Sequence, residues 1–136
     1  MTDRNIQTKD TRLLKYREQH KHRLNYMPWL YWSLKPKNRG WADEWQKEYQ
    51  AYLMDMETVE IGENSFISPL AHIFAEPGRK IIIGDNTFIA ADCTLHGPLE
   101  IGNEVSIKHH CILDGGRVGI KIHEQARLAA YCHLYA

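Results

Sequence analysis

The stretch IGDNTFIAADCTL at residues 83–95 decides the fold. Aliphatic side chains recur in it every six positions, at Ile83, Ile89 and Leu95. Three more rows of the same kind are Ile61, Ile67 and Ile73; Ile101, Ile107 and Leu113; and Ile122, Leu128 and Leu134. The rows begin 22, 18 and 21 residues apart, so two of these 18-residue units carry inserts of four and three residues. A fixed six-residue period predicts a mainly β fold, a left-handed parallel β-helix of about four coils.

Strand geometry explains the residues between the aliphatic positions. Side chains alternate faces along a strand, so the residue four places after an aliphatic also faces inward, and the next faces outward. The inward set is Ser65, Ala71, Thr87, Cys93, Val105, Cys111, Ala126 and Cys132, all small or modest in size. The outward set is Phe66, His72, Phe88, Thr94, Ser106, Ile112, Arg127 and His133. Large outward apolar side chains usually mark contacts. We therefore expect at least two of Phe66, Phe88 and Ile112 to be covered by a neighbouring subunit or by the N-terminal helices.

The corners carry Ile-Gly-Glu-Asn at 61, Ile-Gly-Asp-Asn at 83 and Ile-Gly-Asn-Glu at 101. Gly, Asn and Asp tolerate the positive φ that a tight corner requires. The three cysteines occupy one inward column at 93, 111 and 132, where free Cys packs as a small hydrophobe. We expect them to be reduced and buried, with neither a disulfide nor a metal.

Residues 1–55 are predicted to form a helical N-terminal segment, and residues 56–136 the β-helix, incomplete at its C-terminal end. Leu13, Tyr16, His20, Leu24 and Met27 form one apolar stripe at helical spacing. The segment from Lys35 to Gly40 is typical of a loop, and a second helix is expected from Trp41 onward. These helices should cap the first coil, because a terminal coil exposes an apolar end. Alternatively, the basic residues of the first helix form an anion-binding patch. They are Arg12, Lys15, Arg17, Lys21 and Arg23.

The charge balance and the hydropathy of the sequence argue against two classes, nucleic-acid-binding proteins and membrane-spanning proteins. The formal net charge is zero, with +4 in residues 1–55 (11 Lys/Arg, 7 Asp/Glu) and −4 in residues 56–136 (6 against 10). This balance argues against a dedicated nucleic-acid binder. No apolar run approaches the roughly 18 residues of a membrane span, and no signal peptide is visible. The sequence thus predicts a cytoplasmic protein without membrane partners.

The repeats resemble hexapeptide-repeat acyltransferases, and most closely the maltose- and galactoside-type sugar O-acetyltransferases. The resemblance covers residues 57–136 and includes CILDGG at 111–116 and AAYCHLY at 129–135. It implies a homotrimer with active sites between subunits. It also implies acetyl-CoA as a co-substrate, no tightly bound cofactor and a small hydroxyl acceptor. A histidine would act as general base on the acceptor hydroxyl.

The match to this family is incomplete. Asp114 matches a family acidic residue near the acceptor, whereas Lys108 stands where the family usually places an acceptor-contacting Asn. His123 replaces the Gly expected after Ile122. The family's base would fall about three residues beyond Ala136, so the sequence is expected to be truncated at its C-terminus. The alternative is a non-catalytic β-helix that serves as a scaffold or interaction subunit.

Two histidines remain candidates for the missing base. His110 follows Ile107 at a corner, and His133 faces outward one coil further along. Most such histidines are simply solvated. A third reading has these two converge with a neighbouring subunit on a metal or proton-transfer site. That arrangement resembles trimeric β-helix carbonic anhydrases, although their ligand motifs are not visible here.

Overall fold

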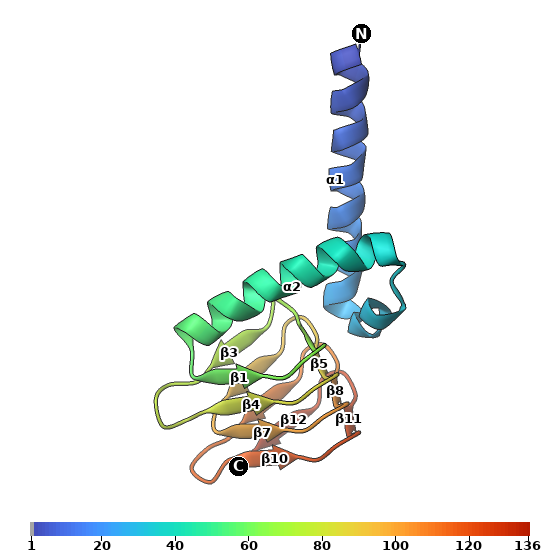
Figure 1. The fold of residues 1–136 in the computed structure, drawn as a ribbon. Coiled ribbons are helices and arrows are strands. Elements are labelled where there is room, and N and C mark those ends of the chain that lie inside the picture. The colour runs from blue at the N-terminus through green and yellow to red at the C-terminus, as the bar shows by residue number, and fades with distance from the viewer. Residues whose placement is uncertain (1) are drawn as a thin grey trace.

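The computed structural model describes residues 2–136, with side chains from residue 11 onward. Four coils form a parallel β-helix with three four-stranded faces (Figure 1). Sheet A consists of β1 (Val59–Ile61), β4 (Ile81–Ile83), β7 (Leu99–Ile101) and β10 (Ile120–Ile122). Sheet B consists of β2 (Phe66–Ile67), β5 (Phe88–Ile89), β8 (Ser106–Ile107) and β11 (Arg127–Leu128). Sheet C consists of β3 (His72–Phe74), β6 (Thr94–His96), β9 (Ile112–Asp114) and β12 (His133–Tyr135). The predicted architecture is confirmed.

The six-residue spacing sets the register of every strand pair. Ile83, for example, lies opposite Ile61 in the preceding coil and opposite Ile101 in the following one. The interior of the middle coils is closed to solvent: Ile89 and Leu95 expose 0% of their surface. In the last coil Leu128 and Leu134 are only half-buried.

The prediction of buried, unbonded cysteines is confirmed for Cys93 and Cys111, whereas Cys132 is unbonded but exposed in part. They are free thiols, buried at Cys93 and Cys111 and half-buried at Cys132. The Cys93 thiol donates to the Lys108 carbonyl at 3.0 Å, and the Cys111 thiol to the Ala129 carbonyl at 3.1 Å. Contact with the Cys111 thiol and burial both raise the pKa of Cys93. Because the thiolate is the nucleophile, the raised pKa keeps Cys93 as an unreactive packing residue.

Two different demands shape the corners between sheets A and B. Positive φ falls on Asn64 and Asn86, the third residue after each strand. Gly84 serves a different purpose, because a Cβ there would lie 2.6 Å from the carbonyl carbon of Gly102 in the next coil. Asn side chains then join the coils, as where Asn64 Nδ2 donates to Asn86 Oδ1 at 2.7 Å. The corner motif therefore combines close approach with left-handed backbone.

The N-terminal segment consists of α1 (Thr2–Tyr26), the 3-10 helix η1 (Pro28–Ser33) and α2 (Pro36–Met56). The ribbon shows α1 projecting from the body, whereas α2 crosses the end of the first coil (Figure 1). The loop predicted at Lys35–Gly40 is wrong, because α2 already begins at Pro36. Proline is well suited to the first helical position, where its missing N–H has no partner to lose. In the part of the chain described, no helix is long and apolar enough to cross a bilayer.

Helix α2 closes the first coil with both apolar and polar contacts. Leu53 is buried in the β-helix core, and Tyr49 packs against it. Gln46 is 2% exposed. Its Nε2 donates to the Ile67 carbonyl at 3.0 Å, and its Oε1 accepts from the Ile67 N–H at 2.8 Å. These are the backbone groups that a neighbouring strand would otherwise pair. Gln50 Nε2 donates to the Ser65 carbonyl at 2.8 Å. The predicted capping role is present, and side-chain amides satisfy the edge of β2.

Aromatic residues of the N-terminal segment cover the outer face of the first two strands of sheet B, β2 and β5. Phe66 and Phe88 are buried against them, and the ring of Tyr31 lies 5.4 Å from that of Phe66. The partners are Tyr31, Trp32, Trp41 and Trp45. Two of the three outward apolar side chains are thus covered by the chain itself, as expected, while Ile112 is half-buried.

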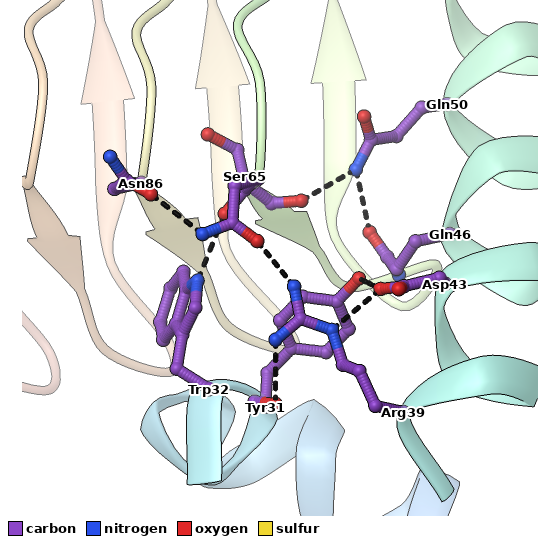
Figure 2. A network of polar contacts seen from close by, with 9 residues as sticks. Tyr31, Trp32, Arg39, Asp43, Gln46, Gln50, Ser65 and Asn86 are labelled. Atoms are coloured by element: carbon purple, nitrogen blue, oxygen red, sulfur yellow. Dashed lines mark hydrogen bonds and ion pairs between the residues drawn. The ribbon is translucent and has the colours of Figure 1, made fainter. Parts of the chain in front are cut away.

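A polar network fastens the same junction (Figure 2). Arg39 donates to Asp43 through Nε at 2.6 Å and to Asn64 through Nη2, and its guanidinium lies 4.1 Å from the centre of the Tyr31 ring. The Tyr31 hydroxyl donates to Asp43. Burial, followed by that hydrogen bond, raises the pKa of Tyr31. Through these contacts Arg39 and Asp43 join α2 to Tyr31 of η1 and to the corner at Asn64.

We predict that replacing two glycines by alanine changes the free energy of unfolding in opposite directions. Gly84→Ala should lower the free energy of unfolding by about 1–3 kcal/mol, because the added methyl group overpacks against the next coil. Gly40→Ala is the matched control. It lies in α2 with no atom within 4 Å of the added Cβ, so it should stabilise by about 0.5–1 kcal/mol. Urea unfolding measures both changes, and a neutral Gly84→Ala would contradict the close-approach role.

We predict that Gln46→Leu lowers the free energy of unfolding, even though leucine is apolar and the site is buried. It leaves the buried N–H and carbonyl of Ile67 without partners, at a cost of about 1–3 kcal/mol for each unsatisfied group. The exposed neighbouring change Lys47→Ala should have little effect. Hydrogen exchange provides the second measurement: the Ile67 amide should lose protection in Gln46→Leu and keep it in Lys47→Ala.

Candidate functional site

On the outer face of sheet C, the last residues of the four strands form a column that contains an imidazole and a carboxylate. His96 closes β6 and Asp114 closes β9, and the two are register partners on adjacent coils. Phe74 and Tyr135 occupy the same position one coil before and one coil after them. Both rings are exposed, at 48% and 66%. The in-register stacking of the coils therefore brings an imidazole and a carboxylate together between two exposed rings.

The insert that follows β3 adds a second carboxylate. Both Glu76 carboxylate oxygens lie 3.1 Å from His96 Nε2. Arg79, in the same insert, places its Nε 3.4 Å from Glu76 and donates through Nη2 to the Gly116 carbonyl at 2.8 Å. The insert is thus held against the loop that follows β9. We call Glu76, His96 and Asp114 the sheet C triad.

Hydrogen-bonding rules orient the imidazole of this triad. A carboxylate only accepts, so in a neutral His96 the proton belongs on Nε2, facing Glu76. The other ring nitrogen, Nδ1, then has a free lone pair and lies 3.7 Å from Asp114 Oδ1, too far for a direct hydrogen bond. Hydrogen bonds from its own backbone N–H and from His96 lower the pKa of Glu76. The arrangement is suited to a base oriented by a carboxylate, with its accepting nitrogen open to a small solute.

The sequence-predicted residues divide between different faces. Asp114 belongs to the sheet C triad, where its Oδ1 accepts from the Gly116 N–H at 3.1 Å. Lys108 is not near it: this side chain lies at sheet B, with Nζ 5.5 Å from the centre of the Trp29 ring. The structure does not bring the two predicted acceptor-binding residues together.

The two candidate base histidines are also separate. The His110 ring stacks on Tyr131, with centroids 4.8 Å apart, and its Nε2 lies 3.6 Å from Asp92 Oδ2. His133 begins β12 on sheet C, with its ring 6.5 Å from that of Tyr135. Within the described side chains, no hydrogen bond, ion pair or ring contact joins the two histidines.

Around His110 the corner between sheets B and C serves mainly to attach α1. The Tyr26 hydroxyl, at the end of α1, donates to Asp92 Oδ2 at 2.9 Å, and the His109 ring lies 6.1 Å from that of Tyr26. Asp92 and His110 both adopt positive φ. Among the described residues, no group of three or more His, Cys, Asp or Glu side chains is placed to hold a metal ion.

Sequence reasoning missed His96 and Glu76 as site residues. The signal for His96 was present, since it follows Leu95 as Asp114 follows Leu113, one row later. Glu76 had no such signal, because it lies in the four-residue insert, outside the six-residue period. Only the path of that insert places its carboxylate beside the imidazole.

Comparison with known proteins adds no family to this picture. The chain matches no family model, no curated protein and no solved structure.

The lowered pKa of Glu76 predicts a pH dependence. A carboxyl whose pKa is lower folded than unfolded adds stability above its unfolded pKa and loses it as the pH falls through the folded value. Wild type should therefore be more stable than Glu76→Gln at neutral pH, and the gap should close below about pH 4.3, the usual Glu pKa. Urea unfolding across pH measures it, with the exposed Glu48→Gln as control. An NMR titration that places the Glu76 pKa at or above its usual range would contradict the hydrogen bonds that its carboxylate accepts from its own backbone N–H and from His96.

Proposed function

We propose that this β-helix is an acyltransferase of hexapeptide type that transfers acetyl from acetyl-CoA to a hydroxyl acceptor bound at the sheet C triad. One observation carries the proposal: His96 is held by Glu76 on one nitrogen and presents the other beside Asp114. The predicted family activity needs a base of this kind and an acidic group that orients the acceptor.

The triad supplies the proton transfers that such a reaction needs. His96 Nδ1 removes the proton from the acceptor hydroxyl as its oxygen attacks the thioester carbonyl. The C–O bond forms, the C–S bond breaks, and the CoA sulfur leaves with the proton that the imidazolium returns. Glu76 stabilises the imidazolium while it carries that proton. Asp114 accepts a hydrogen bond from a second hydroxyl of the acceptor, which favours polyols and sugars. A positioned general base contributes about 10²–10⁴-fold to the rate.

Accessibility is consistent with a small-molecule site. The His96 side chain is 36% exposed, so an acceptor reaches it without any rearrangement of the fold. Phe74 and Tyr135 flank it as exposed rings, and apolar surface of this kind is commonly covered on assembly. We propose that a second copy of the chain packs on Phe74 and Tyr135 in a homotrimer and leaves His96 open to the acceptor.

The test is acceptor-dependent release of the CoA thiol, followed with a thiol reagent across a panel of sugars and polyols. His96→Gln should lower the rate by about 10²-fold or more, and Glu76→Gln by a smaller factor, because Glu76 only orients and stabilises the base. His123→Gln removes an exposed corner histidine and should leave the rate unchanged.

Two outcomes would overturn the proposal. The first is acceptor-independent or absent thiol release by the folded wild type, which would favour the alternative of a non-catalytic scaffold. The second is a wild-type rate in a folded His96→Gln variant, which would place the base elsewhere.

A further inference from the structure

A groove on the outer face of sheet B is separate from the sheet C triad. Its volume is about 370 Å³, within the range of small-molecule sites. We call it the sheet B groove. Its lining residues are Trp29, Phe88, Ser106, Lys108, Arg127, Leu128 and Ala129.

A step in side-chain size creates the groove. Along the outer column of sheet B, the register partners are Phe66, Phe88, Ser106 and Arg127. The two phenylalanines fill the space under the N-terminal segment. Ser106 is too small to continue that packing, so a hollow opens below Trp29, whose ring lies 6.3 Å from that of Phe88. Trp29 remains 45% exposed at the edge of the hollow.

The charges of the groove are all of one sign. Lys108 and Arg127 line it, and no carboxylate does. Three other cations of the β-helix have acidic partners: Arg79 lies 3.4 Å from Glu76, Lys80 2.6 Å from Glu60, and Lys121 3.5 Å from Glu100. Lys108 and Arg127 form no ion pair with any described side chain. The two cations are therefore available to an anion from solution.

We propose that the sheet B groove binds a phosphorylated small molecule with a planar base, of the mononucleotide class. Arg127 presents a planar fork of N–H donors that matches phosphate oxygens, and Lys108 adds a second positive charge. The Ser106 hydroxyl supplies a neutral donor on the floor of the groove. The exposed indole of Trp29 offers an apolar surface against which a base can stack, a contact that tolerates any base. The site is independent of the proposed acyl transfer, since it shares no residue with the triad.

The experiment is calorimetric titration of the full chain with AMP, adenosine and inorganic phosphate. AMP should bind at least about tenfold more tightly than either fragment, because only AMP engages both the cations and the indole. Raising the salt concentration should weaken AMP binding. Equal affinity for AMP and inorganic phosphate would show that the base is not recognised and would overturn the assignment.

Variants test whether the binding occurs in this groove. Lys108→Met and Arg127→Gln should each weaken AMP binding about tenfold, the effect of losing one charge-assisted hydrogen bond. Lys121→Met and Arg117→Gln remove exposed cations outside the groove and should leave binding unchanged. All four lie on the surface, so thermal melting should show intact folding. No AMP binding at millimolar concentration, or wild-type binding in both groove variants, would refute the proposal.

Discussion

In-register stacking of the coils is the constraint on which the rest of this structure depends. Each inward aliphatic side chain must lie over its partner in the preceding coil, as Ile83 does over Ile61, because any slip would turn apolar side chains outward. Once the register is set, the outward side chains also form columns. The pairing of His96 with Asp114 and the neighbouring positions of Ser106 and Arg127 both follow from this packing rule. The positions of these outward side chains therefore follow from the register that the packing of the core requires.

The N-terminal segment determines which columns remain open. It buries Phe66 and Phe88 on sheet B and closes the first coil through Gln46, so the part of sheet B around these two rings and that end of the β-helix are structural. Sheet C has no such cover from the described residues near the triad, and the lower part of sheet B is hollow beneath Trp29. The aromatic residues that stabilise the fold thus leave two separate surfaces open. One is the sheet C triad, and the other is the sheet B groove, whose charged side chains are all cations.

Much of the fold was predictable because a strict period is a strong local signal. The inward cysteines and the outward phenylalanines followed from alternation and spacing, and the capping role of the helices followed from the exposed apolar end of a terminal coil. The start of α2 was missed because the Pro-Lys-Asn-Arg-Gly composition is typical of loops. In the helix, Arg39 pairs with Asp43 one turn further along. At the candidate site, Asp114 came from its family motif, whereas Lys108 lies on a different face of the same chain. Its side chain lies beside Trp29, a residue about 80 positions away in sequence.

The sequence by itself determined the coils, their register and the residues of each column, because strand alternation turns a six-residue period directly into inward and outward positions. It did not determine where the insert between β3 and β4 runs, or where η1 places its tryptophan. Those segments have no period, and their positions depend on long-range contacts such as Glu76 with His96 and Trp29 with Phe88. Tertiary structure alone therefore decided which outward columns became a triad and a groove, since both need a side chain supplied from outside the repeat.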